Sequence, residues 1–351
     1  MKSTSVPSVS VYDPNHLNPY GLELASTLAA GGAKIQLWRV RNSKAMKLAG
    51  ITELNHLAPP RGSARASSIL IRRLFAPLWF VLTVPSKDVV VIAWTRDAWD
   101  GFLLLVRAVL LRRTVVVYHN PRQVRARGGL SGKMEWLLLR MGNPAVHSEW
   151  LAGLAREDFN RVMVAIHPPY FETTRRVAAW TPPPRGDSPI VAFVGALRMD
   201  KGVGDLVAIA SASGGGWTLR LCTDQRLSPE TVELLAALDV RVQNISDKAP
   251  TDAELNAGLL GSDLVIAPYR SVTESGSILL ALSIGVPILA YSSPAVASVL
   301  VRSAQAAGPS ELGGLIGQFL SSPWQTNADA TDRRSLSIED WKKVVSNATA
   351  R

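Results

Sequence analysis

The sequence of residues 264–287 predicts a strand, a polar loop and a helix in immediate succession, an order typical of α/β folds. The strand, Leu264–Ala267, is short and wholly apolar. Glu274-Ser275-Gly276 then opens an apolar helix that ends at Gly285. A helix start offers backbone N–H groups and the positive end of a dipole, which together suit a phosphate or diphosphate. The alternative is a capped helix that only joins two strands of a sheet.

Residues 190–202 have the same order, with a buried-type strand followed by a turn at Gly195. Arg198 and Lys201 come next, just before another helix. Ligands of α/β sheets bind outside the carboxyl ends of the strands, so these cations could meet the anion that Ser275 and Gly276 face. Arginine grips two phosphate oxygens and lysine supplies a point charge. Taken singly, each is more often a solvated loop cation.

Strand-like and helix-like segments alternate through both halves of the chain. Runs rich in β-branched residues, such as 88–94 and 114–118, are typical of buried parallel strands. A proline-rich stretch at 180–189 interrupts the alternation. We therefore predict an α/β protein of two Rossmann-like, doubly wound parallel-sheet domains, 1–180 and 181–335. Residues 336–351 are predicted to form a last helix that could cross back to the first domain.

The net charge of +10 is concentrated in the first half. Residues 1–180 hold 24 Lys and Arg against 11 Asp and Glu, whereas 181–351 hold 14 against 17. This split indicates that one domain faces an anionic partner. Zinc-finger spacing, an RNA-binding aromatic motif and an obvious recognition helix are all missing from the sequence, so nucleic acid is not the expected partner.

Two apolar segments that carry arginines, 69–84 and 102–113, indicate an anionic membrane surface instead. Neither reaches the ~20 residues needed to span a bilayer. The alternative is that both are core helices with a solvated basic edge. Residues 1–16 lack the apolar core of a signal peptide, and Cys222 is the only cysteine. We expect a cytoplasmic protein, peripheral on the inner face of the plasma membrane.

Several short motifs occur together in the two halves. The second half contains Gly195, Arg198, Lys201-Gly202, a strand that ends at Tyr269, Ser275-Gly276 and Gly285-Val286-Pro287. The first half contains Asn18-Pro19-Tyr20 and Tyr118-His119-Asn120. Over roughly residues 8–320, this combination resembles GT-B glycosyltransferases of the GT4-like clan. It is particularly similar to xanthan-type bacterial exopolysaccharide mannosyltransferases, which act on polyprenyl-diphosphate-linked sugars.

The resemblance implies transfer of a hexose, such as mannose, from a UDP- or GDP-linked donor to a lipid-linked or polysaccharide acceptor. Arg198, Lys201, Ser275 and Gly276 would hold the donor diphosphate. Gly195, Tyr269 and Glu274 would lie near the donor sugar or nucleotide, and His119 would contact the donor sugar or acceptor. No cofactor is expected, and the lack of an Asp-x-Asp triplet favours chemistry without a metal.

One departure from the clan concerns stereochemistry. Most members carry two glutamates separated by seven residues around this helix and retain anomeric configuration. Leu282 lies eight positions beyond Glu274, and alignment on Gly285 and Pro287 places Val272 and Leu280 at the glutamate positions instead. Neither register restores the pair, and the xanthan-type relatives that lack it invert configuration.

Inversion requires a general base on the first domain. Asp97, which follows a strand, is the first candidate, and a helix N-cap is its alternative role. Asp13 follows the first strand and is the second candidate, with a turn aspartate before proline as its alternative. For His119, the alternative is a structural histidine bonded to the backbone.

Other functions remain open at this stage. A dehydrogenase is disfavoured because no Gly-x-Gly-x-x-Gly opens a helix after a strand. A noncatalytic protein of the same fold, which binds a nucleotide sugar or glycan at the membrane, would explain the missing glutamate pair. A membrane-bound scaffold of a polysaccharide assembly complex would bind liposomes without binding nucleotides.

Overall fold

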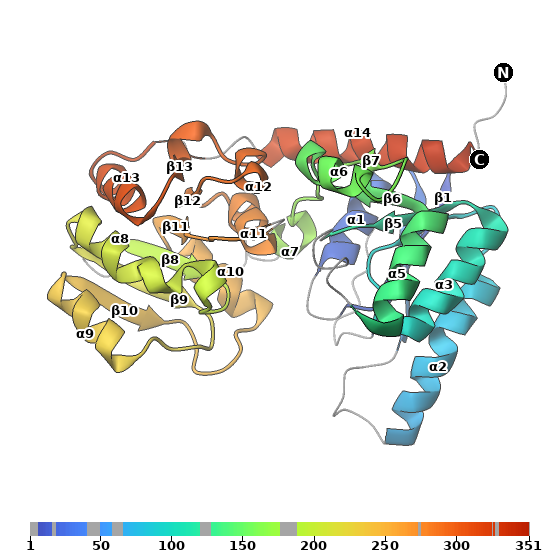
Figure 1. The fold of residues 1–351 in the computed structure, drawn as a ribbon, viewed down its shortest axis with the longest axis horizontal. Helices are drawn as coiled ribbons and strands as arrows, with labels where there is room; N and C mark the ends of the chain where they lie inside the picture. The colour runs from blue at the N-terminus through green and yellow to red at the C-terminus, as the bar shows by residue number, and fades with distance from the viewer. Residues whose placement is uncertain are drawn as a thin grey trace. The chain divides into compact units, whose positions relative to one another are not determined.

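A computed structural model describes residues 6–15, 19–40, 50–57, 66–119, 128–175, 188–272, 275–324, 326 and 330–350, without the side chains of 55–57, 66–74, 175 and 330–332. The chain divides into two compact units (Figure 1). Unit 1 comprises Met1–Pro168 and Arg334–Arg351, and unit 2 comprises Pro169–Arg333.

Unit 1 is built on a seven-stranded sheet of order β3-β2-β1-β4-β5-β6-β7, in which every neighbouring pair is parallel. The strands are β1 (Ser8–Asp13), β2 (Lys34–Val40), β3 (Ile51–Leu57), β4 (Val89–Ile92), β5 (Thr114–Val117), β6 (Asn143–Val146) and β7 (Met163–Val164). Their apolar character follows from burial on both faces, as parallel sheets require.

Helices cover both faces of this sheet. Along β4, Val89 and Val91 belong to one apolar core while Val90 and Ile92 belong to the other, because successive side chains of a strand point to opposite faces. The first core is completed by α1 (Tyr20–Ala30) and α14 (Ala330–Thr349). The second is completed by α2 (Ala66–Thr83), α3 (Ala98–Leu111), α5 (Gly129–Met141) and α6 (Glu149–Arg156).

The last helix is anchored in unit 1 by Trp341. This side chain is fully buried among residues of α1 and the sheet, and its Nε1 donates to the Ile166 carbonyl oxygen at 3.2 Å. Ser337 Oγ donates to the same oxygen at 2.9 Å. The C-terminal segment is therefore part of the core of unit 1.

Truncation of Trp341 is expected to destabilise unit 1. Trp341→Ala should lower the free energy of unfolding by about 3–5 kcal/mol, since it leaves a large cavity. The matched control is Leu336→Ala on the same helix, whose exposed side chain should make a difference within about 0.5 kcal/mol. Urea unfolding followed by circular dichroism measures both. Equal effects would show that α14 does not contribute to this core.

Unit 2 repeats the architecture with a six-stranded parallel sheet of order β10-β9-β8-β11-β12-β13. Its strands are β8 (Ile190–Val194), β9 (Trp217–Cys222), β10 (Val240–Asn244), β11 (Leu264–Ala267), β12 (Ile288–Tyr291) and β13 (Gln305–Ala306). Its helices are α7 (Phe171–Arg175), α8 (Leu206–Ser213), α9 (Pro229–Ala237), α10 (Asp252–Leu260), α11 (Gly276–Ile284), α12 (Pro294–Ala297) and α13 (Pro309–Ser321).

The predicted fold class, two doubly wound parallel-sheet domains, is confirmed. The boundary between the units falls between Pro168 and Pro169, twelve residues before the predicted position, and most of the predicted 180–189 linker lies outside the described residues. The last helix begins at Ala330 rather than in 336–351. Strand β3 was not predicted, because its sequence ITELNHL mixes polar with apolar residues.

Candidate functional site

Strand order reverses once in each sheet, between β1 and β4 in unit 1 and between β8 and β11 in unit 2. Such a reversal opens a crevice at the carboxyl ends of the two strands, where α/β proteins bind ligands. The predicted site residues lie in the loops that leave these strands or start the following helices. His119 is one strand further on, at the end of β5.

In unit 2, Tyr269 organises the reversal point. Its hydroxyl donates to the Val194 carbonyl oxygen at the end of β8. Burial raises the pKa of Tyr269 to about 12, although the nearby Ser277 and Ser275 hydroxyls oppose this change. The tyrosine therefore stays neutral and ties the end of β8 to the segment that follows β11.

Lys201 lies over the same tyrosine. Its Nζ is 4.1 Å from the centroid of the Tyr269 ring, within the range of a cation–π interaction. Burial lowers the pKa of Lys201, and the nearby Arg198 charge adds to this effect while Asp200 opposes it. A partly desolvated ammonium gains more from an anionic partner than a fully hydrated one does.

Arg198 is held by an acid two residues away. Its Nε and Nη2 donate to the two carboxylate oxygens of Asp200 at 3.0 and 2.9 Å, which lowers the pKa of that carboxyl. The two side chains are 60% and 43% exposed, so the ion pair contributes little to stability. Arg198 can exchange this carboxylate for an incoming anion at small cost.

Ser275, Gly276 and Gly195 lie in the loops at the same reversal point. Ser275 is the N-cap of α11 and accepts a hydrogen bond from the Ile278 N–H at 3.3 Å. Gly195 has φ 105°, and a Cβ there would come within 3.4 Å of the Tyr269 hydroxyl. A Cβ on Gly276 would come within 2.9 Å of the Tyr170 hydroxyl. Glu274 lies outside the described residues.

Two residues of this site were not predicted. Tyr170 precedes α7, far from α11 in the sequence, and its N–H donates to Ser283 Oγ at 3.0 Å. Arg270 follows Tyr269 and is a third cation at the reversal point. Its Nε donates to Asp205 at 3.0 Å, and Tyr291 donates to the same carboxylate at 3.0 Å. The position of Arg270 three residues after β11 was the available sequence signal.

The loop that carries Lys201 lies against the end of β11. Arg270 N–H donates to the Asp200 carbonyl oxygen at 3.0 Å. Gly202 has φ 78°, and a Cβ there would be 2.0 Å from the Pro268 carbonyl oxygen. Only glycine fits both the backbone conformation and the space.

Gly202→Ala is therefore expected to destabilise unit 2 by about 3 kcal/mol or more, since a backbone clash adds to left-handed strain. Gly214→Ala is the matched control, because Gly214 has φ 83° with nothing within 4 Å of its Cβ position. It should cost only about 1–2 kcal/mol. Thermal unfolding compares the two variants, and similar losses would contradict the close approach at Pro268.

In unit 1, Asp13 ends β1 and caps the start of α1. One carboxylate oxygen accepts from the Asn15 N–H at 3.0 Å and the other from the Gly21 N–H at 3.1 Å. Burial is the main influence and raises the pKa of Asp13 to about 7, although both hydrogen bonds and the Arg39 charge oppose it. Asp13 is thus a carboxyl group that changes protonation near neutral pH.

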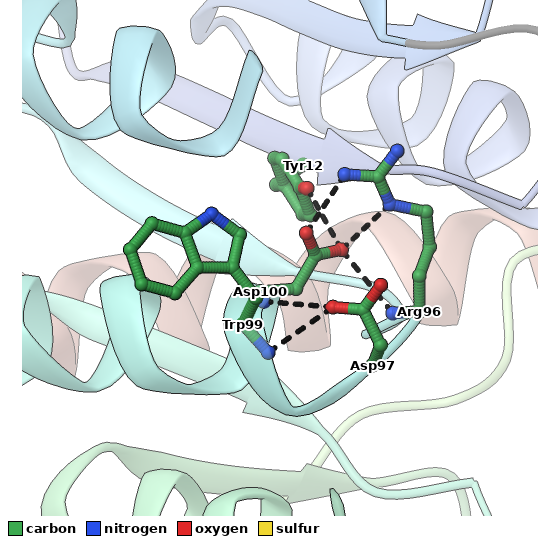
Figure 2. A network of polar contacts seen from close by, with 5 residues as sticks. All are labelled: Tyr12, Arg96, Asp97, Trp99 and Asp100. Carbon is green, nitrogen blue, oxygen red and sulfur yellow. Dashed lines mark hydrogen bonds and ion pairs between the residues drawn. The ribbon is translucent and has the colours of Figure 1, made fainter. Parts of the chain in front are cut away.

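Asp97 is the N-cap of α3. Its Oδ1 accepts from the N–H groups of Trp99 and Asp100, both at 3.1 Å, and its side chain is partly exposed. Figure 2 shows that the neighbouring Arg96 and Tyr12 converge instead on Asp100. Arg96 grips both oxygens of Asp100, at 2.8 and 2.7 Å, and Tyr12 donates at 3.0 Å. Asp97 therefore has its alternative role in the structure, as the N-cap of a helix.

His119 stacks on Trp94, with ring centroids 3.9 Å apart and planes at 8°. Its Nε2 donates to the Ala93 carbonyl oxygen at 3.1 Å. Burial, with a smaller contribution from His147, lowers the pKa of His119 well below its usual range, so the ring is neutral at pH 7. The hydrogen bond to Ala93 joins the ends of β4 and β5. His119 thus has the bond to the backbone that is expected of a structural histidine.

No protein-family model and no curated protein matches the sequence. Solved structures do match over nearly the whole chain. Sucrose-phosphate synthase from Thermosynechococcus elongatus is 14% identical with a TM-score of 0.65, covering 98% of this chain and 95% of that one. HepE from Anabaena in complex with UDP is 11% identical with a TM-score of 0.58, covering 98% and 96%. WaaG, a glycosyltransferase involved in lipopolysaccharide biosynthesis, is 12% identical with a TM-score of 0.52, covering 97% and 95%.

The chain has the GT-B fold. Its unit 2 gathers three cations, a serine N-cap and two glycines at one reversal point, an arrangement suited to a diphosphate. Its unit 1 supplies a carboxyl group with a pKa near neutrality at the other reversal point, an arrangement suited to proton transfer. The described residues include no group of three His, Cys, Asp or Glu side chains placed to hold a metal ion.

Proposed function

We propose that this GT-B chain is a glycosyltransferase that moves a hexose from a nucleotide-diphosphate sugar to a lipid-linked or polysaccharide acceptor. The observation that carries the proposal is the position of Lys201 over Tyr269, whose hydroxyl donates to the Val194 carbonyl oxygen at the end of β8. HepE, which has the same fold, was solved with UDP and with UDP-glucose, which supports a nucleotide sugar as donor.

Departure of the nucleotide diphosphate is the step that unit 2 would stabilise. As the glycosidic bond breaks, negative charge develops on the leaving phosphate. Lys201 and Arg198 supply positive charge there, and the first turn of α11 supplies backbone N–H groups and a helix dipole. We propose that these groups replace a divalent metal ion, so that the chemistry is metal-independent.

Activation of the acceptor hydroxyl is assigned to unit 1. The missing glutamate pair supports an inverting reaction, which needs a base to take the proton as the hydroxyl attacks. We propose Asp13 as that base, because its raised pKa matches the pH at which a base must accept protons. Asp97 is the alternative, and His119 would then orient the sugar or acceptor rather than take the proton.

The similarity of the motifs to xanthan-type enzymes supports mannose as the sugar and a polyprenyl-diphosphate glycan as the acceptor. WaaG, of the same fold, is involved in lipopolysaccharide biosynthesis. We place the enzyme on the inner face of the plasma membrane, in exopolysaccharide biosynthesis.

The test is transfer from radiolabelled GDP-mannose, UDP-glucose and related donors to a short-chain prenyl-diphosphate glycan, with and without EDTA. We expect one donor to be consumed, no effect of EDTA, and a product whose anomeric configuration, read by NMR, is inverted. Nucleotide binding without turnover of any donor would favour the noncatalytic binding protein that the missing glutamates also allow.

A further inference from the structure

Helices α2 and α3 of unit 1 are neighbours (Figure 1), and both expose large apolar side chains. On α2 the exposed residues recur at helical spacing, on a different side of the helix from the buried Ala76 and Phe80. A similar stripe runs along α3. We define the α2–α3 apolar face as Phe75, Trp79, Leu82, Trp99, Phe102, Val109 and Leu110, which are 40% to 71% exposed.

These exposed residues lie on two helices that contact each other. Trp99 and Phe102 stack with ring centroids 5.9 Å apart at 23°. Large exposed apolar side chains gathered on neighbouring helices are uncommon on a soluble surface and mark a binding face. Tryptophan and phenylalanine beside leucine are the residues that amphipathic helices insert at a membrane interface.

The positively charged side chains beside this face favour an anionic partner. Lys87, Arg112 and Arg113 follow the C-terminal ends of α2 and α3, and Arg113 Nη1 donates to the Lys87 carbonyl oxygen at 3.0 Å. The sequence of α2 contains no acidic residue. The only acid within α3 is Asp100, which is buried and bonded to Arg96 and Tyr12. Positive charge therefore borders the C-terminal end of this face, and Asp97 is a partly exposed carboxylate at the N-terminal end of α3.

We propose that the α2–α3 apolar face binds the surface of a bilayer that contains anionic lipids. The apolar side chains enter the interface, and Lys87, Arg112 and Arg113 pair with headgroup phosphates. Binding is peripheral, since none of the helices in the described parts of the chain has the length and apolar character to cross a bilayer. Trp99 is two residues from Asp97, so the face begins at the reversal point of unit 1. The inference rests on the proposed function where it explains how a lipid-linked acceptor reaches that point.

Vesicle flotation tests the apolar component. Wild-type protein should float with phosphatidylcholine vesicles that contain about a third phosphatidylglycerol and much less with pure phosphatidylcholine. Phe75→Ser/Trp79→Ser/Leu82→Ser should weaken binding at least tenfold. The matched control is Leu234→Ser/Leu336→Ser, which removes exposed leucines elsewhere. Circular dichroism melting confirms that both variants fold.

The cations are tested by Lys87→Gln/Arg112→Asn, where asparagine suits the left-handed backbone of Arg112 (φ 52°). Binding to anionic vesicles should fall about fivefold per cation, and added salt should remove the difference. Lys248→Gln/Arg302→Gln, two exposed cations of unit 2, is the control and should bind as wild type does.

Three results would overturn the inference. The first is wild-type protein that does not float, and the second is an apolar triple variant that floats like wild type. The third is a dimer in analytical ultracentrifugation that the same triple substitution dissociates, which would assign the face to a second copy of the chain. Flotation is measured without nucleotide and nucleotide binding without vesicles, so failure here is distinguishable from failure of the proposed transferase activity.

Discussion

Lys201→Ala is expected to lower kcat/KM for sugar transfer by about two to three orders of magnitude, the range typical of one lost electrostatic contact to a developing anion. The reason is that Lys201 is a partly desolvated cation over the Tyr269 ring at the start of α11. Steady-state rates with the donor identified by screening provide the measurement.

The control for Lys201 is Lys248→Ala, which removes an exposed cation of the same unit and should leave the rate unchanged. Arg198→Ala should reduce the rate as well, and Asp200→Asn should not, because Asp200 only pairs with Arg198. Wild-type rates for both Lys201→Ala and Arg198→Ala would remove the basis for placing the diphosphate at this reversal point.

Asp13→Asn is expected to lower kcat by about two to four orders of magnitude, the usual contribution of a positioned base. The base acts when deprotonated, so the wild-type rate should rise as pH increases through about 7 and then level off. The variant should lack this rise. Asp97→Asn, which can keep the N-cap through its amide oxygen, should retain most of the activity and the same pH profile.

Asp13 also has a readout that does not depend on activity. A carboxyl whose pKa is raised on folding favours the folded state below its unfolded pKa, and this contribution is lost as pH rises from about 4 through 7. A rise in the pKa of Asp13 from 3.8 to about 7 corresponds to roughly 4 kcal/mol of folding stability. Asp13→Asn should abolish this pH-dependent loss of stability, measured by urea unfolding.

Loss of activity in Asp97→Asn, with normal activity in Asp13→Asn, would assign the base to Asp97.

Local sequence signals predicted much of this fold. Helix α1 ends at Ala30 because Gly31-Gly32, a local stop signal, follows it directly. The start of α11 at Ser275-Gly276 and its end at Gly285 were likewise local capping signals. Strand β3 gave no such signal, since its polar residues interrupt the apolar pattern.

The sequence also predicted which loops lie at the reversal points, but not how their side chains pair. The bonds of Asp205 to Arg270 and to Tyr291 join residues 65 and 86 positions apart, so their pairing depends on the tertiary fold. The raised pKa of Asp13 depends on its burial beneath α1, which no motif encodes. The N-cap role of Asp97 was a stated alternative, because aspartate before a helix is a common cap.

Calorimetric titration with UDP and with GDP tests the central assignment most directly. The account predicts saturable binding of one nucleotide to the wild-type protein, without added metal, and binding at least tenfold weaker to Lys201→Ala. Lys248→Ala should bind as tightly as wild type. Equal affinity of wild type and Lys201→Ala, or no binding of either nucleotide, would contradict a diphosphate site at the start of α11.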